Sequence, residues 1–493
     1  MTMDNVTISR LRTGVRGLDE ALGGGLPEFS FNLITGPPGA GKTTLAHQIM
    51  FGMATSERPA VYFTVLGEPP LKMLRYQQQF AFFDSKKVGR SVRFISLGED
   101  VAAGGLDQVL GVVSADVKVH EPALVFVDSL RSLLLAGESA ASGLVNQQRF
   151  MQELGTLMTS WEATTFLIGE YFSATEQNPV FTVSDGLIHL HQSVQRNSVV
   201  RKLEIAKMRG QATLPGLHTF RISAAGVSVF SAPELPGTAE SFETTGPLVR
   251  LPMGVPGLDA MMGGGLPCGY SLLVAGPSGS GKSILASAFL VEGARRGHTG
   301  VIAAFEQRPN KARGQELSDL IERGRVGVVD TRSPTLSVDE ISVLLIAEVH
   351  RLKATRVVID SLSGFELALA PTFRDDFRES LSRMVSALAR SGVTVLMTSE
   401  LEDRYNELRF SPYGTAFLTD AIIVQRYIEI DSRLRRVMAV VKVRSSAHSN
   451  ELRLFHIDDD GIKIDKMLTG YEGLLGGMPS RRPSPNGVGA DDV

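Results

Sequence analysis

The sequence has very little cysteine and almost no excess charge, and both scarcities restrict what the protein does. Its single cysteine, Cys268, cannot form an internal disulfide or a zinc site built from several thiolates. We therefore expect a reducing, cytoplasmic compartment. Lysine and arginine total 50 against 53 aspartate and glutamate, which gives a formal net charge of −3. A near-neutral chain lacks the strong positive field that is typical of dedicated nucleic-acid binders.

Long apolar runs are also absent. The amino-terminal segment MTMDNVTISRLR has no apolar core of a secretion signal, and no stretch reaches ~18 uninterrupted apolar residues. These features predict a chain that is neither secreted nor embedded in a membrane. A hydrophobic content of 43% with 21% charged residues is instead typical of a folded protein, and 493 residues allow several domains.

The same ordered motifs occur twice in the chain. GVRGLDEALGGGLP at 14–27 returns as GVPGLDAMMGGGLP at 254–267. A glycine-rich segment, an Asp-Ser-Leu segment and a Lys-x-Arg segment follow in the same order in both halves, which indicates a duplicated domain. We predict a first domain at 1–231, a linker rich in Pro, Gly, Ser and Thr at 232–247, a second domain at 248–474 and a flexible tail at 475–493.

Each half alternates short apolar runs with helical patterns. The first half contains SFNLIT, LVFVD and TTFLIG, and the second contains YSLLVA, GVIAAF, RVVID and TVLMTS. Buried strands that alternate with helices predict an α/β fold with a mostly parallel sheet flanked by helices in each half. In such sheets the ligand binds at the carboxyl ends of the strands.

Two glycine-rich segments, GPPGAGKT at 36–43 and GPSGSGKS at 276–283, match the phosphate-binding loop pattern. Their glycines let backbone N–H groups surround a phosphate, while Lys42 and Lys282 reach the β- and γ-phosphates. The predicted nucleotide contacts are Gly36, Pro37, Pro38, Gly39, Ala40, Gly41, Lys42, Thr43 and Thr44 in the first loop, and Gly276, Pro277, Ser278, Gly279, Ser280, Gly281, Lys282, Ser283 and Ile284 in the second.

A magnesium ion is predicted at each loop. The Thr43 and Ser283 hydroxyls are placed to ligate Mg²⁺. Asp128 and Asp360 each end an apolar run, the position from which a carboxylate holds the water shell of the metal. Glu170 and Glu400 end corresponding later strands, where each is either a sensor of the γ-phosphate or an ordinary surface carboxylate.

Together the GLD…GGGLP lead-ins, the two phosphate loops, the Asp-Ser-Leu strands and the Lys-x-Arg segments resemble the double-domain KaiC-like ATPases of the RecA superfamily. The resemblance extends from about residue 9 to about residue 470. It implies two tandem RecA-like domains with ATP and Mg²⁺ as cofactors. It also implies a two-tiered homo-hexamer that binds ATP at its subunit interfaces.

The catalytic acids differ between the halves. Members of that family carry Phe-Glu-Glu after the second strand, and one glutamate polarises the attacking water. In the second half Glu306 and Gln307 occupy these positions, so we predict hydrolysis there. In the first half Leu66 and Gly67 occupy them and Glu68 lies one position later. Either the loop shifts so that Glu68 serves, or the first site binds ATP with little turnover. We favour the second alternative.

Basic pairs recur near the end of each half. Lys207 and Arg209 in KMRG, and Lys442 and Arg444 in KVRS, match the basic pair that the family presents to the ATP of a neighbouring subunit. Such cations stabilise charge on the transferring phosphoryl group. Ordinary surface charges on a strand are the alternative interpretation.

Autokinase activity of the clock type is one alternative function. The resemblance places the usual Ser-Thr acceptor pair at Ala416 and Phe417, and neither residue has a hydroxyl. Ser411, Thr415 and Thr419 are nearby hydroxyls that keep this alternative open.

A RecA-like motor that handles DNA is a second alternative, and it would require basic loops with stacking aromatic residues. The basic clusters are short: Arg433, Arg435 and Arg436 near a hairpin, and Arg481 with Arg482 in the tail. We therefore favour a slow ATPase, most active in its second repeat, that signals through unidentified protein partners and binds neither nucleic acid nor membrane.

Overall fold

The computed structural model divides the chain into two compact units, Met1–Ser231 and Ala232–Val493. It describes residues 8–65, 70–130, 133, 143–171, 179–195, 198–231, 249–305, 315–329, 331, 337–369, 377–401, 418–430, 432–467, 471–472 and 480–481. The predicted linker at 232–247 lies outside the described residues, so its bounds stay a prediction.

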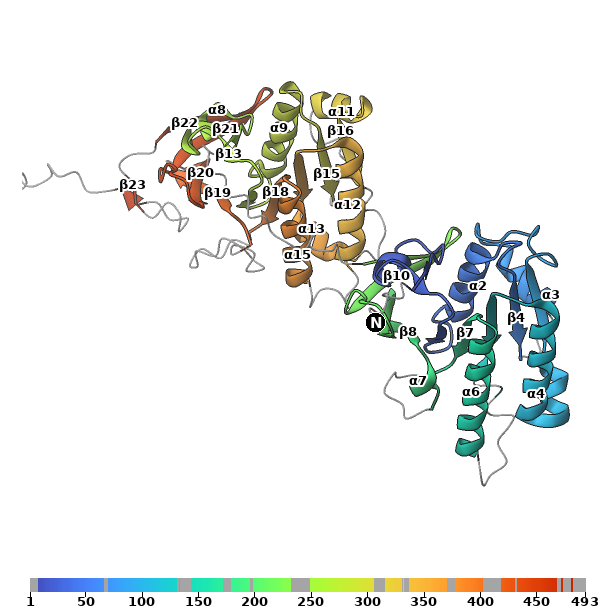
Figure 1. Cartoon of the computed structure of the whole chain (residues 1–493). Helices are drawn as coiled ribbons and strands as arrows, with labels where there is room; N and C mark the ends of the chain where they lie inside the picture. The colour runs from blue at the N-terminus through green and yellow to red at the C-terminus, as the bar shows by residue number, and fades with distance from the viewer. Residues whose placement is uncertain are drawn as a thin grey trace, which may run out of the picture. The chain divides into compact units, whose positions relative to one another are not determined.

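The first domain is built on a nine-stranded sheet with the order β11-β10-β9-β8-β3-β7-β6-β4-β5 (Figure 1). Its strands are β3 (Phe31–Thr35), β4 (Ala60–Thr64), β5 (Val92–Ser96), β6 (Leu124–Asp128), β7 (Thr164–Gly169), β8 (Gly186–Gln195), β9 (Ser198–Met208), β10 (Leu217–Ser223) and β11 (Gly226–Phe230). Its helices are α1 (Leu18–Ala21), α2 (Lys42–Met53), α3 (Pro70–Gln77), α4 (Gly98–His120), α6 (Gly143–Ser160) and α7 (Pro179–Val183). Strands β1 (Arg10–Leu11) and β2 (Leu26–Pro27) pair separately.

The central parallel strands of this sheet, β3, β4, β6 and β7, are buried on both faces. Ile34 and Phe126 belong to the apolar cluster formed with α2, whereas Leu33 and Val125 belong to the cluster formed with α4 and α6. On the α2 face the Phe126 and Phe166 rings stack with their centroids 4.6 Å apart. Burial on both faces explains why these strands appear in the sequence as continuous apolar runs rather than alternating ones.

The second domain repeats this plan with the strand order β16-β15-β17-β18-β14-β19-β20-β21-β22. Its strands are β14 (Ser271–Gly276), β15 (Gly300–Ala304), β16 (Val326–Val329), β17 (Arg356–Asp360), β18 (Thr394–Glu400), β19 (Ala421–Ile430), β20 (Arg433–Val443), β21 (Arg453–Asp458) and β22 (Gly461–Met467). Its helices are α8 (Pro256–Met261), α9 (Lys282–Arg295), α11 (Gln315–Glu322), α12 (Val338–Leu352), α13 (Leu362–Ala368) and α15 (Phe377–Arg390). The short pairs are β12 (Arg250–Leu251) with β13 (Leu266–Pro267), and β23 (Tyr471–Glu472) with β24 (Ser480–Arg481).

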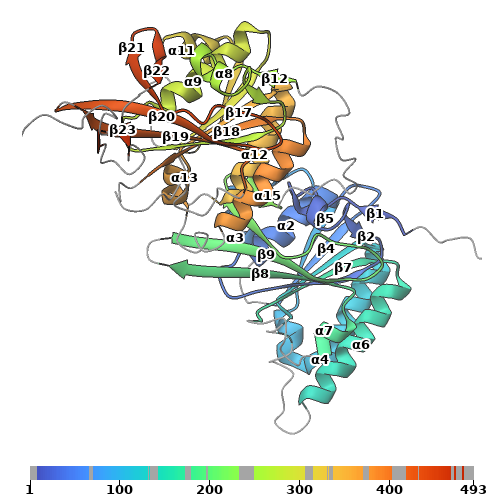
Figure 2. The ribbon, with the colours of Figure 1, turned by 90° about the vertical axis from the view of Figure 1, so that its left-hand side faces the viewer.

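The predicted fold class is confirmed, because each domain has a mostly parallel sheet with helices on its faces. The apolar runs do not predict the antiparallel pairing at one edge of each sheet, which joins β8–β11 in the first domain and β19–β22 in the second. Figure 2 shows β8 and β9 as a long hairpin at this edge. None of the helices in the described part of the chain combines the length and the apolar character needed to span a bilayer.

Candidate functional site

The first glycine-rich segment connects β3 to α2 at the carboxyl edge of the parallel strands. Gly41 precedes the helix with a φ of 104°, a left-handed backbone that glycine adopts without strain. A Cβ at this position would lie 2.5 Å from Ile222 Cδ1, so a larger residue would also displace the end of that side chain. The helix begins at Lys42, and the free N–H groups of its first turn adjoin the loop, an arrangement that favours a bound anion.

The Lys42 side chain lies across this loop. Its Nζ donates to the carbonyl oxygens of Gly36 and Pro37, both at 2.9 Å, and lies 3.9 Å from Glu170 Oε1. Burial lowers the pKa of Lys42, and the negative charges of Glu170 and Asp128 oppose that effect. An ammonium group in this position would contact a phosphate that is bound to the loop.

Asp128, the last residue of β6, lies beside the start of α2. Its Oδ2 accepts a hydrogen bond of 2.8 Å from the Thr43 hydroxyl and one of 2.7 Å from the Tyr62 hydroxyl. Because Thr43 donates its proton to the aspartate, the lone pairs of the threonine oxygen remain available to a cation. Burial raises the pKa of Asp128, and the two hydroxyls and Lys42 oppose that rise.

We expect Asp128→Asn to stabilise the ligand-free protein and to weaken magnesium-dependent nucleotide binding. Because burial raises the native pKa of Asp128 above that of the unfolded chain, its ionised form reduces the free energy of unfolding at neutral pH. This penalty disappears as the pH falls through the raised pKa, and D128N lacks it at every pH. Thermal melts should give D128N a Tm at or above that of the wild type without ligand and a smaller rise with Mg·ATP. A ligand-free Tm well below that of the wild type would contradict this expectation.

The second glycine-rich segment connects β14 to α9 in the same way. Lys282 Nζ donates to the carbonyl oxygens of Gly276 and Pro277 at 2.8 and 2.7 Å. The loop is also tied to the adjoining strand β19, because the Ser280 hydroxyl donates to Gln425 Oε1 at 3.0 Å. The two loops are also alike in burial. The middle of each loop is exposed, at Pro38 and Gly39 in the first and at Ser278 and Gly279 in the second, while Ala40 is buried. Thr44 and Ile284 lie in the first turns of the helices that follow.

Asp360 ends β17 at the place that Asp128 takes at the end of β6. It is buried, and it accepts a hydrogen bond from the Thr398 hydroxyl on β18. Ser283 lies in the first turn of α9, where Thr43 lies in α2.

These residues fit a magnesium ion bound together with a nucleotide. Mg²⁺ prefers hard oxygen ligands and is usually held by one or two protein groups in addition to phosphate oxygens. Thr43 and Asp128 are in direct hydrogen-bond contact at the mouth of the first loop and offer a hydroxyl and a carboxylate. Ser283 and Asp360 provide the same kinds of oxygen ligand in the second domain.

The two Lys-Arg pairs lie at the other end of the sheets from the phosphate loops. Strand β9 ends beside the start of β8, so Lys207 and Arg209 adjoin the amino ends of the parallel strands. Lys207 Nζ donates to the Ser184 carbonyl at 2.6 Å, and Arg209 Nη1 lies 3.1 Å from Asp185 Oδ1. The five residues of β3 separate this edge from the loop by about 17 Å, so the pair cannot reach the loop of its own domain.

The second domain holds its pair in the same arrangement. Lys442 Nζ donates to the Thr419 carbonyl at 2.6 Å, and Arg444 Nη1 lies 3.2 Å from Asp420 Oδ1. Asp420 in turn accepts the backbone N–H of Ser271 at 3.0 Å, at the start of β14. Asp185 likewise accepts the backbone N–H of Phe31 at 3.0 Å, so both pairs are anchored at the first residue of the strand that ends in the phosphate loop.

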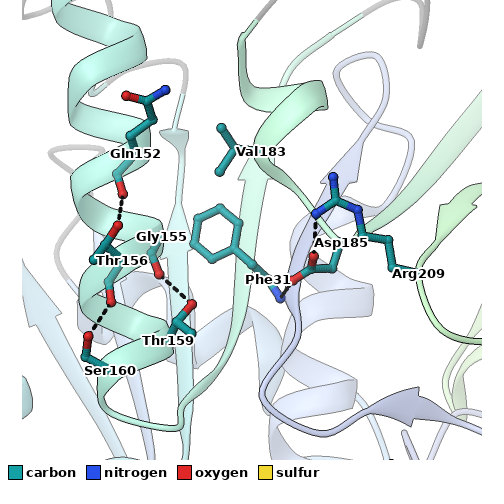
Figure 3. Close-up of a pocket in the computed structure, with 9 residues that line it drawn as sticks. All are labelled: Phe31, Gln152, Gly155, Thr156, Thr159, Ser160, Val183, Asp185 and Arg209. Carbon is teal, nitrogen blue, oxygen red and sulfur yellow. Dashed lines mark hydrogen bonds and ion pairs between the residues drawn. The ribbon is translucent and has the colours of Figure 1, made fainter.

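A cavity of about 630 Å³ opens beside the first of these pairs. Figure 3 shows Arg209 and Asp185 on one side of it and the carboxyl-terminal half of α6 on the other. Its lining residues are Phe31, Gln152, Gly155, Thr156, Thr159, Ser160, Val183, Asp185 and Arg209. The cavity therefore lies at the amino ends of the strands and is separate from the phosphate loop of the same domain.

The predicted catalytic acids lie outside the described residues. This applies to Glu306 and Gln307 in the second half, and to Leu66, Gly67 and Glu68 in the first, so their roles stay predictions.

Of the two strand-end glutamates, Glu170 directly follows β7, and its Oε1 lies 3.9 Å from Lys42 Nζ. Glu400 is the last residue of β18, and its side chain is exposed. The contact with Lys42 favours the interpretation of Glu170 as a residue of the phosphate site.

The side chains that donate to the two aspartates could not be identified from the sequence. Tyr62 lies in the apolar run AVYFT and Thr398 in TVLMTS, and both appear there as core residues of a buried strand. In the sequence each is one hydroxyl within a mostly apolar run. It points to the aspartate only once the order of the strands shows that the two runs are neighbours in the sheet.

Comparison with known proteins agrees with this geometry. The family model described as "ATPase: KaiC" matches residues 11–234 and 251–469. The chain is similar to the circadian clock oscillator protein KaiC of Picosynechococcus sp., with 25% identity over 488 residues that cover 96% of this chain and 93% of the relative. It is 25% identical to KaiC of Synechococcus elongatus over 494 residues, covering 97% and 93%. It is 24% identical to KaiC of Prochlorococcus marinus over 491 residues, covering 97% of each chain.

Proposed function

The chain belongs to the KaiC family of ATPases, and from this membership we propose that it binds Mg·ATP in both phosphate loops and hydrolyses it slowly. Turnover occurs chiefly in the second repeat, where Glu306 follows the strand β15. In the first repeat Leu66 and Gly67 occupy the aligned positions, so this site mainly binds the nucleotide.

The observation that carries this proposal is the triad of lysine, hydroxyl and aspartate at each loop. In the first domain Lys42 covers the loop and Thr43 contacts Asp128 at 2.8 Å. Mg²⁺, when bound there, neutralises charge on the phosphate oxygens. The lysine contributes a second positive charge where the γ-phosphate would lie, and the loop N–H groups hold the phosphates in place.

Hydrolysis in the second repeat then requires one protein base. Glu306 takes a proton from the attacking water, whose oxygen bonds to the γ-phosphorus as the bond between that phosphorus and the ADP oxygen breaks. Lys282 stabilises the charge on the departing phosphate groups.

The basic pairs support binding at subunit interfaces of a homo-hexamer. Arg209 and Arg444 cannot act on the loops of their own domains, because they lie at the opposite ends of the sheets. In a ring of like subunits each pair would face the nucleotide of the neighbour, with the cavity beside Arg209 at the contact. ATP then forms part of the interface.

The output that we propose is signalling through protein partners that recognise the nucleotide state of the ring. The curated relatives are named as circadian clock oscillator proteins, but this chain has Ala416 and Phe417 where the resemblance places the phosphorylated pair. Thr419, the described hydroxyl nearest to that position, is fully buried. These features favour a regulatory ATPase over an autokinase.

Counting the nucleotides retained by the purified chain tests the proposal directly. Native mass spectrometry in the presence of Mg·ATP should find two adenine nucleotides per wild-type chain. It should find one in K42A, one in K282A and none in the double variant, because each lysine serves one loop. A wild-type chain that retains no nucleotide would contradict the proposal.

The same preparation distinguishes the alternative functions. Stimulation of phosphate release by single-stranded DNA would favour a DNA motor. Phosphate found on Ser411, Thr415 or Thr419 after incubation with Mg·ATP would favour an autokinase. We expect neither result.

A further inference from the structure

The two metal-binding aspartates are held by different side chains in the two repeats. In the first repeat the Tyr62 hydroxyl donates to Asp128 Oδ2 at 2.7 Å from β4. Its ring is fully buried, with its centroid 4.6 Å from that of His47 and 5.5 Å from that of Phe94. This packing fixes the hydroxyl, because a buried ring has few alternative rotamers.

The second repeat lacks this tyrosine. By the register of β15 with β17, the position that corresponds to Tyr62 holds Ile302. Asp360 accepts instead from the Thr398 hydroxyl of β18, the strand on the other side of β17. The first repeat has Ile168 at the position of Thr398, directly paired with Asp128.

We propose that Tyr62 and Thr398 are positioning residues for magnesium, each specific to the site of its own repeat. A hydroxyl that donates to a carboxylate fixes the rotation of that carboxylate. In the first repeat the oxygen that accepts from Tyr62, Asp128 Oδ2, also accepts from Thr43, so the tyrosine holds the carboxylate against the predicted magnesium ligand. The inference rests on the proposed function, because it presupposes Mg·ATP at both loops. Its consequence is that the magnesium requirement of the two sites is set by different strands and is altered separately by substitution.

The decisive measurement is nucleotide binding as a function of magnesium concentration, with one site inactivated at a time. In the full chain K282A leaves the first site and K42A leaves the second. A fluorescent, non-hydrolysable ATP analogue then reports binding while Mg²⁺ is titrated. We expect Y62F in the K282A background to raise the half-maximal Mg²⁺ concentration by about tenfold, the usual effect of losing such a partner.

Matched variants test whether the effect is specific to one site. T398V in the K42A background should produce a similar shift, whereas Y62F in the K42A background should produce none. Adding I168T to Y62F supplies the first repeat with the donor that the second uses. This rescue should return the half-maximal Mg²⁺ concentration to within about threefold of its original value.

The outcomes separate this inference from the proposed function. If K282A alone fails to retain the analogue at any magnesium concentration, the proposed function is wrong for the first site. If K282A binds the analogue and Y62F leaves its magnesium dependence unchanged, the inference is wrong and the proposed function stands. A variant whose Tm falls while its half-maximal Mg²⁺ concentration stays constant would assign the hydroxyl a packing role and overturn the inference. Should Y62F not fold, T398V decides by the same criterion.

Discussion

Lys282→Ala is expected to lose most of the steady-state ATP hydrolysis of the protein, whereas Lys42→Ala retains the larger part of it. Both side chains cover their loops alike, with Nζ within 2.9 Å of two loop carbonyls. Removing such a preorganised cation usually reduces turnover about 100-fold or more. The difference arises from the acids, since Glu306 follows the second loop while Leu66 and Gly67 follow the first. Phosphate release by each variant measures the contribution of each site.

Glu306→Gln distinguishes loss of chemistry from loss of binding. Glutamine keeps the size of the side chain but cannot accept the proton of the attacking water, so turnover should fall about as far as in K282A. Nucleotide occupancy should stay at two per chain, whereas K282A should lose one. Rapid phosphate release by E306Q would show that Glu306 is not the general base. Equal losses of turnover in K42A and K282A would mean that both sites hydrolyse ATP.

The fold was predictable from the sequence because its central parallel strands are buried on both faces. Runs such as LVFVD contain no polar residue before their final aspartate, and such runs have few alternatives to a central strand. The antiparallel edge was not predictable in the same way. Strand β10 has two of its seven residues exposed and carries Arg221 among its apolar residues, so its sequence lacks a continuous apolar run.

The phosphate loops were predictable because their chemistry is local. Glycines, lysine and hydroxyl lie within eight consecutive residues, so spacing alone brings them together. The partners of the aspartates were not predictable, because Tyr62 and Asp128 are 66 residues apart and meet only through the order of the strands. The difference between the repeats is equally hidden, since an isoleucine in place of Tyr62 or Thr398 preserves the apolar pattern of the strand.

If the chain forms the proposed homo-hexamer, removing nucleotide is expected to dissociate this ring into smaller species, and adding back Mg·ATP is expected to reassemble it. The reason lies in the geometry of the basic pairs. Arg209 and Arg444 are anchored to Asp185 and Asp420 at the amino edges of the sheets, the opposite edges from the loops. A phosphate that contacts such a pair must therefore belong to another domain, which in the proposed ring lies in the neighbouring subunit. Light scattering coupled to size exclusion measures the change in mass.

The size of this effect follows from linkage. A ligand that binds only the assembled interface stabilises it by about 2.7 kcal/mol per site when its concentration is 100 times Kd, and a ring contains many such sites. Arg209→Ala and Arg444→Ala should each weaken assembly at a given ATP concentration. R444A should also lower turnover, by about 1,000-fold or more if the Arg444 guanidinium acts as an arginine finger. R209A serves as the matched control, because its site contributes little hydrolysis. A ring of unchanged mass in nucleotide-free buffer, or an R444A variant with normal turnover, would mean that each domain completes its site without a neighbour.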